Sequence, residues 1–216
     1  MRNDCACFKQ EPKFIISVKQ RFNRKVTFNY TAEILEILNK YLSNEAIQKF
    51  RQIIFGHILD VEVVHGQAQV VHGILLREIE SLEADTIEFY IERNVLKFGL
   101  KEFGTVSGLR IYGNMNMPVF YDKDYRLKNE YLKEDVLVKK HTLLDAIKYR
   151  RWANDDDAVK LAILCVIHTY ILSSRPKTHI SHEYFALVES GKYADYPWGL
   201  TSFRMVYSSL KGRLAK

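Results

Sequence analysis

Apolar residues recur every three to four positions over most of this chain, a period that predicts amphipathic helices. The clearest case before the middle of the chain is 32–42, which begins after Thr31, a residue type suited to capping a helix. A second helix from Ser43 or Asn44 is expected to end at Gly56 in a left-handed conformation. Further helices are predicted at 67–81, 100–107, 127–134, 143–152, 156–172, 179–189 and 201–210.

The segment 156–172 differs from the other helices because its apolar residues run all the way round. A helix of this kind is buried on most of its sides. Asn154 and Asp155 are suited to capping its start, and Asp155, Asp156 and Asp157 place negative charge where the helix dipole favours it. We therefore expect 156–172 to be the central buried helix of the fold.

A small β-hairpin is predicted at about 87–98. Two short β-prone runs, 87–91 and 95–98, lie on either side of a polar three-residue turn, Glu92-Arg93-Asn94. The chain then turns at Gly99 into the helix 100–107, which is expected to stop at Gly108. The apolar residues of this strand–turn–helix unit are expected to pack against the central helix: Phe98, Leu100, Phe103, Val106 and Leu109.

These elements predict a mainly α (α+β) fold in one globular helical domain, residues 26–210. A basic, loose extension (1–25) precedes it and a tail (211–216) follows. The formal net charge is +6; residues 1–30 hold seven basic and two acidic side chains, so +5 of it lies there. The nearly neutral body makes nucleic acid a weaker default partner. The longest apolar run, 161–167, is too short to cross a bilayer, and no secretory signal is evident, so no membrane association is expected.

Candidate catalytic and metal-binding residues all favour structural interpretations. Cys165 and His168 could share a helical face, but apolar neighbours predict a buried thiol with a raised pKa. Asp155, Asp156 and Asp157 are explained as helix-start charges rather than a cation site. Spacing also argues against metal sites at His57, His65, His72, Cys5 and Cys7. His179 and His182 have an i, i+3 spacing, but no paired acid or Cys follows at a zinc-like distance. We expect no catalytic residue, metal or cofactor in this chain.

One basic and aromatic surface is a candidate for nucleic-acid contact. Basic side chains beside aromatic rings can hold phosphates and stack on bases. Cations in the last turn of a helix are also favourable without any ligand, and this interpretation stays open. The candidate contacts are Lys139, Lys140, Lys148, Arg150 and Arg151.

Five segments, taken in order, resemble a plant domain of unknown function. They are Arg51–Asp60, Val71–Ile79, Phe98–Leu109, Lys160–Ser173 and Tyr196–Gly199 leading to Ser202-Phe203. That domain commonly lies upstream of SUMO-protease-like (ubiquitin-like protease) domains in proteins derived from Mutator-like transposable elements. The strand–turn–helix unit is also similar to the plant mobile domain. The motif residues are given structural roles: Phe55, Gly56, Phe98, Gly99, Phe103, Gly108, Leu109, Pro197, Trp198 and Gly199.

The resemblance implies a non-catalytic interaction or accessory module that binds a protein partner. It favours a nuclear over a cytoplasmic location. The associated protease needs a His, Asp, Gln and Cys in a separate domain, and Cys165 lacks the Gly-Cys context of that nucleophile. We therefore expect no enzyme activity. Two alternatives remain: a nucleic-acid-binding module, and a fragment of a SUMO-protease-like cysteine peptidase. The sequence does not determine the oligomeric state.

Overall fold

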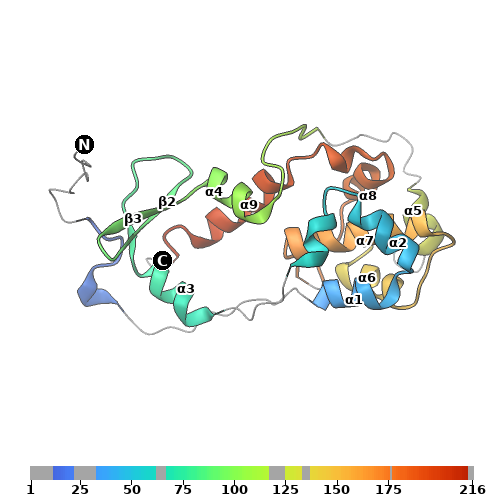
Figure 1. Ribbon diagram of the computed structural model, residues 1–216, viewed down its shortest axis with the longest axis horizontal. Coiled ribbons are helices and arrows are strands. Elements are labelled where there is room, and N and C mark those ends of the chain that lie inside the picture. Colours follow the sequence, from blue (N-terminus) through green and yellow to red (C-terminus); the bar gives the residue numbers. More distant parts are fainter. Residues whose placement is uncertain are drawn as a thin grey trace, which may run out of the picture.

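The computed structural model describes residues 12–21, 33–61, 67–116, 125–132, 137–175 and 177–213. Most of these residues are helical, and a three-stranded antiparallel sheet accompanies the helices, which confirms the mainly α (α+β) class. The molecule is elongated, with a helical end and an end that holds the sheet (Figure 1). Cys5, Cys7 and His65, together with most of 1–30 and with residues 214–216 of the tail, lie outside the described residues.

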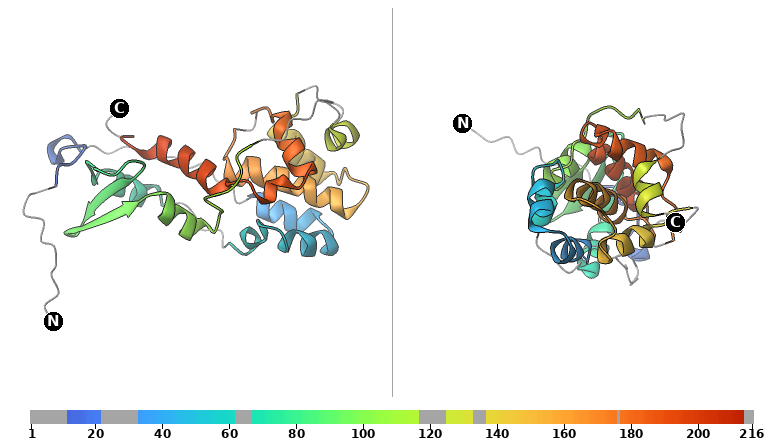
Figure 2. Two further views of the ribbon diagram at one scale, coloured as in Figure 1. Left: turned by 90° about the horizontal axis from the view of Figure 1, so that it is seen from above. Right: turned by 90° about the vertical axis from the view of Figure 1, so that its right-hand side faces the viewer.

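The helical end is built around one buried helix, α7 (Asp155–Val166). The view along the long axis places α7 in the middle of its neighbours (Figure 2). The elements at this end are α1 (Glu33–Tyr41), α2 (Asn44–Arg51), η2 (Gly56–Asp60), α5 (Arg126–Tyr131), α6 (Lys140–Lys148), α7, η3 (Ile167–Ile171), α8 (His182–Glu189) and η4 (Lys192–Ala194). The prediction of a central buried helix at about 156–172 is confirmed.

Local contacts explain where α7 begins and how it continues. The Asn154 side chain accepts a hydrogen bond from the Asp157 N–H at 2.9 Å, which is the predicted cap. After Val166 the helix widens into a π-type turn, η3, in which the Leu172 N–H donates to the Ile167 carbonyl at 2.8 Å. The buried helix therefore spans the full predicted length in two hydrogen-bonding patterns.

The sheet has the order β1 (Glu78–Ile79), β2 (Ile87–Ile91) and β3 (Asn94–Phe98), all antiparallel. The predicted hairpin is confirmed, and Ile91 pairs with Asn94 across its turn. The turn therefore has two residues rather than three. Glu92 and Arg93 both have positive φ values, 48° and 66°, as a tight primed hairpin turn requires.

The helix expected at 67–81 is shorter than predicted. It forms α3 (Ala68–Leu75), and the following residues turn and pair as β1 with β2. The helix was predicted too long because Ile79 lies four residues after Leu75, which continues the helical spacing of apolar residues. Ile79 is buried, but as part of the sheet. The Glu80 N–H also donates to the Lys13 carbonyl at 3.0 Å, so part of the N-terminal extension lies along β1.

The strand–turn–helix unit packs differently from the prediction. Its helix, α4 (Leu100–Ser107), lies against α9 (Trp198–Leu210) rather than along α7. The rings of Phe98 and Phe103 are 6.0 and 5.8 Å from the ring of Phe203 in α9. Val106 was expected to be buried but is 88% exposed. Leu109 does join the larger hydrophobic cluster.

Two glycine predictions have different outcomes. Gly108 ends α4 with φ of 67°, as expected for a left-handed C-terminal residue. Gly56 does not end α2 in that way; it begins η2 with an ordinary φ. It is required for a different reason, because a Cβ there would lie 2.1 Å from the Arg51 carbonyl oxygen.

Helix α9 connects the two ends of the molecule (Figure 1). Trp198 at its start belongs to the larger cluster around α7, whereas Tyr207 and Leu210 pack against a smaller one formed by Leu75, Ile87 and Phe89. Among the described residues, no helix is long and apolar enough to span a bilayer.

Candidate interaction groove

The chain segment after α4 crosses the first turn of α9 at very short range. The Gly199 N–H donates to the Arg110 carbonyl at 2.7 Å, and the Asn114 N–H donates to the Asp195 carbonyl at 3.0 Å. A Cβ at position 199 would lie 2.8 Å from the Leu109 carbonyl oxygen. Only glycine at this position permits the crossing as it stands.

A groove of about 630 Å³ opens beside this crossing. Its floor is apolar and includes Phe55, Leu109 and Trp198, all of which are buried. Exposed side chains form its rim, with Ile54 and Tyr112 as the large apolar ones. None of its lining residues is acidic; they are Ile54, Phe55, Lys101, Gly104, Thr105, Gly108, Leu109, Arg110, Ile111, Tyr112 and Trp198.

The floor of the groove is held by packing and by one hydrogen bond. The Trp198 indole N–H donates to the Tyr193 carbonyl at 2.8 Å. Its ring lies 5.9 Å from Phe55 and 4.5 Å from Tyr196, within the range of favourable aromatic contacts. The packing beneath the groove is therefore fixed before any ligand binds, and the large apolar side chains that a ligand would meet are Ile54 and Tyr112.

Arg110 separates the groove from a second, polar hollow of about 320 Å³. Its Nη1 donates to the Asp195 carboxylate at 2.9 Å and to the Ala194 carbonyl at 3.0 Å. The adjoining hollow is lined by Arg110, Gly113, Asn114, Asn116, Lys192 and Asp195. An apolar site and a polar site thus lie next to each other on one surface.

The family-motif residues fall into two groups in the structure. Phe55, Gly108, Leu109 and Trp198 line the groove, and Gly56, Pro197 and Gly199 adjoin them in the chain. Phe98, Gly99 and Phe103 lie instead where β3 and α4 meet α9; the Gly99 N–H is bound by the Glu102 carboxylate at 3.0 Å. Three lining residues lie outside the five segments: Arg110, Ile111 and Tyr112. All three belong to a Gly- and Asn-rich stretch for which no role was predicted.

The five cations proposed for nucleic-acid contact do not form one surface. Lys139 pairs in a β-bridge with His179 at the start of α6. Lys140 is only 9% exposed, and burial lowers the pKa of its amine. Lys148 and the two arginines lie at the other end of α6, about 13 Å along the helix.

At that end, an exposed aromatic ring accompanies the cations. Tyr149 is 71% exposed, and the Arg151 guanidinium lies 5.6 Å from the centre of its ring. Lys148 and Arg150 are exposed, and neither forms an ion pair with a residue that the structure describes. Three of the five predicted residues therefore remain together as a candidate surface.

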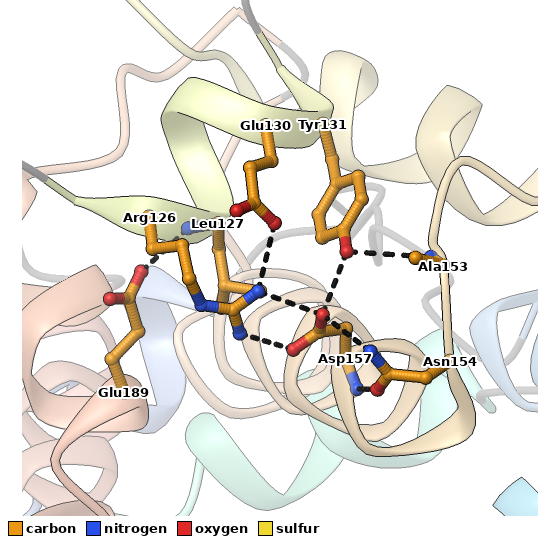
Figure 3. Close-up of polar contacts among 8 residues, drawn as sticks. All are labelled: Arg126, Leu127, Glu130, Tyr131, Ala153, Asn154, Asp157 and Glu189. Carbon is orange, nitrogen blue, oxygen red and sulfur yellow. Dashed lines mark hydrogen bonds and ion pairs between the residues drawn. The ribbon is translucent and has the colours of Figure 1, made fainter.

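The three aspartates at the start of α7 all have protein partners. Ser43 donates to Asp155 at 2.7 Å, and Lys49 pairs with Asp156 at 2.8 Å. Asp157 is buried at the centre of a polar network (Figure 3). Asp155 and Asp156 connect α7 to α2, and Asp157 connects α7 to α5. These contacts fit the structural interpretation of the three charges.

The network around Asp157 holds this carboxylate in its ionised form. Arg126 donates to both of its oxygens, the Tyr131 hydroxyl donates at 2.7 Å, and Asn154 donates at 3.0 Å (Figure 3). The hydrogen bonds from Arg126 are the main reason that the pKa of Asp157 falls to about 2. A buried charge with this many donors stabilises the fold and has no free position for a ligand.

His168 and Cys165 are deeply buried in η3 and α7. Neither ring nitrogen of His168 has a hydrogen-bond partner among the residues that the structure describes, and the ring meets the Tyr184 ring edge-on at 4.7 Å. Burial, with the nearby Lys140 charge, lowers the His168 pKa to about 4, and burial raises the pKa of the Cys165 thiol. This thiol is inaccessible to a substrate. Among the described residues, no three His, Cys, Asp or Glu side chains gather as a metal-ligand set.

Comparison with known proteins places most of the chain in one family. Residues 75–209 match the family described as domain of unknown function (DUF1985). No curated protein and no solved structure matches the chain. The match extends from the end of α3 into α9, so it includes α4, the crossing and Trp198, whereas Phe55 and Gly56 precede it. Since this match covers more than half of its residues, the chain belongs to the DUF1985 family.

Proposed function

We propose that this chain is a non-catalytic protein-interaction module and that its binding site is the groove beside α4 and α9. The observation that carries the proposal is a preformed apolar floor, bordered by exposed apolar side chains and open to solvent. Apolar surface of this kind, with a polar rim, is typical of interaction sites. A bulky apolar side chain of a partner would replace water on Ile54 and Tyr112, the exposed apolar side chains that border the groove above this floor.

The sequence resemblance supports a more specific setting for this module. The resembling plant domain accompanies SUMO-protease-like domains in proteins derived from Mutator-like transposable elements. We propose the same setting here: an accessory module whose peptidase partner lies in another domain, acting in the nucleus. The buried Cys165 thiol supports the assignment of any peptidase chemistry to another domain.

A groove-filling substitution tests the interaction site. Thr105 is an exposed lining residue, so Thr105→Trp should occupy the groove without disturbing the hydrophobic clusters. The adjacent Val106 is 88% exposed and does not line the groove, so Val106→Trp is the matched control. Peptides enriched from a random display library on the unmodified protein should lose binding to the Thr105→Trp variant and retain it on the Val106→Trp variant. Enriched peptides that bind both variants equally would contradict the proposed site.

Nucleic-acid binding is a second candidate function, favoured by the exposed Tyr149 between Lys148, Arg150 and Arg151. It predicts retardation of single-stranded DNA or RNA that weakens with salt. Lys148→Ala combined with Arg150→Asn should weaken it, and asparagine tolerates the left-handed φ of 50° at position 150. Lys40→Ala, at an exposed site on α1, is the control. Retardation that is absent at low salt or unchanged in the double variant would exclude this surface.

A further inference from the structure

We infer that the partner bound by the groove is an acidic peptide: an extended segment with a bulky apolar side chain in the groove and an Asp or Glu carboxylate in the adjoining hollow. This inference rests on the proposed function and adds the chemistry of the partner. It follows from the charges around the two sites, from their position next to each other and from the kind of surface that each offers.

The charges that line the two sites are predominantly positive. Lys101 borders the groove, Lys192 borders the hollow and Arg110 belongs to both. The one lining carboxylate, Asp195, is already bound to Arg110 at 2.9 Å. Lys101 and Lys192 are exposed and form no ion pair with a residue that the structure describes. Two unpaired ammonium groups therefore remain for a carboxylate ligand.

The geometry favours an extended peptide over a single small ligand. Because the two sites share Arg110, a ligand that fills both passes from an apolar floor to a polar one within a short distance. An extended chain advances about 3.3 Å per residue and places alternate side chains on the same side, about 7 Å apart. It can therefore place an apolar anchor and a carboxylate in neighbouring sites.

The polar hollow can also supply neutral donors. Asn114 and Asn116 line it, and their backbone is fixed by the crossing and by the hydrogen bond from the Asn116 N–H to the Asn114 side chain at 2.8 Å. Side-chain amides and ammonium groups both donate to carboxylates. A basic peptide would instead bring like charges to Lys101 and Lys192. A nucleic acid would leave the exposed aliphatic side chain of Ile54 without an apolar partner.

Three pools of synthetic peptides test the inference. Each pool has one fixed leucine, phenylalanine or tryptophan, and the neighbouring positions are Asp/Glu, Asn/Gln or Lys/Arg. Binding is measured by fluorescence anisotropy at low and at moderate salt. We expect the acidic pool to bind about fivefold more tightly than the amide pool at low salt, and this difference should shrink as salt screens the charges. The basic pool should bind most weakly.

Charge reversals identify the residues responsible. Lys101→Glu and Lys192→Glu should each remove the preference for the acidic pool and leave binding of the amide pool nearly unchanged. Lys148→Glu makes the same change in net charge on α6, away from the groove, and should keep the preference. Thr105→Trp should weaken binding of every pool that uses the groove, whatever its charge.

The outcomes separate the two proposals. If the amide or basic pool binds as tightly as the acidic one and Thr105→Trp abolishes binding, the groove is an interaction site but its partner is not acidic. If no pool binds and the display library yields no peptide sensitive to Thr105→Trp, both proposals fail. If single-stranded DNA binds and Lys101→Glu abolishes its binding, the surface recognises nucleic acid and the acidic-peptide inference is wrong.

Discussion

Burial at His168 has a direct consequence for stability as the pH changes. The pKa of this side chain is about 4 in the folded protein, lowered mainly by burial and also by the charge of Lys140, against 6.5 for an unperturbed histidine. The Tyr184 ring lies edge-on to the imidazole, and in the described part of the chain neither imidazole nitrogen has a hydrogen-bond partner. The folded protein therefore holds His168 neutral over a pH range in which the unfolded chain protonates it.

This linkage predicts acid destabilisation at moderate pH. Between pH 6.5 and 4 the unfolded state gains a proton at His168 that the folded state does not, so stability falls as the pH falls. A shift from 6.5 to about 4 corresponds to a loss on the order of 3 kcal/mol. His168→Phe should remove this dependence while filling the same space. Urea denaturation at several pH values measures the free energy of unfolding of both proteins. If this free energy falls equally with pH in both between pH 6.5 and 4, the interpretation is wrong.

Asp157 is expected to contribute over a lower pH range. Its pKa is about 2 when folded and 3.8 ordinarily, so its contribution is present above pH 4 and is lost as the pH falls towards 2. Asp157→Asn should cost about 2 kcal/mol at neutral pH, because Arg126 loses the carboxylate that it binds through both oxygens. Glu130→Gln, which removes the exposed partner of the same arginine, should cost under about 1 kcal/mol. Equal losses in the two variants, measured by chemical denaturation, would show that burial of Asp157 does not matter.

At the scale of elements, the hairpin turn combines a tight geometry with unfavourable residues. Glu92 and Arg93 both occupy the left-handed region, where a side chain costs about 1 kcal/mol or more per residue. Asparagine followed by glycine is the preferred pair for such a turn. Glu92→Asn with Arg93→Gly should therefore raise the free energy of unfolding by about 1 kcal/mol.

The matched control for the turn is Arg93→Ala, which removes the charge but keeps a Cβ at a φ of 66°. It should give no gain. A thermal melt of the three proteins measures the effect, and a gain in the alanine variant as large as in the Asn-Gly variant would assign the cost to charge rather than to backbone conformation.

Elements that are determined by residues close in the chain were predicted more accurately than elements that depend on distant contacts. The start of the second helix at Ser43 or Asn44 and the cap at Asn154 follow from residues close in the chain, and the structure confirms both. The strand β1 was missed because Glu78 and Ile79 become a strand only through their pairing with β2. The contact of α4 with α9 was missed for a similar reason, since Phe203 lies about a hundred positions after Phe103.

At the scale of the whole molecule, the crossing at Gly199 connects segments that are far apart in the chain. Gly199→Ala should lower stability by more than about 2 kcal/mol, because a Cβ would meet the carbonyl oxygens of Leu109 and Arg110 within 3 Å. Gly73→Ala is the matched control: it lies in α3, its Cβ would have ordinary space, and it should stabilise by about 0.5–1 kcal/mol. Thermal denaturation measures the change in stability of each variant, which should be opposite in sign. Destabilisation of similar size in both variants would contradict the close-approach argument.

The candidate site was only partly predictable from the sequence. Phe55, Leu109 and Trp198 were identified as family-motif residues, but nothing in their spacing indicated that they share one floor. The rim residues Arg110 and Tyr112 lie in a segment whose Gly and Asn content predicts a loop and gives no information on what it crosses. Conversely, Lys140 was grouped with surface cations because of its neighbours in sequence, although tertiary packing buries it.

The position of α9 in the chain has a consequence for folding during synthesis. This helix supplies Trp198 to the larger hydrophobic cluster and lies beside the smaller one, yet it follows every other described element in the sequence. Until the ribosome has released it, apolar side chains such as Phe55 and Phe103 lack the partners that cover them. Nascent chains that end before α9 should therefore expose apolar surface, bind chaperones and remain sensitive to protease. Chains that include α9 should acquire resistance to protease in one late step.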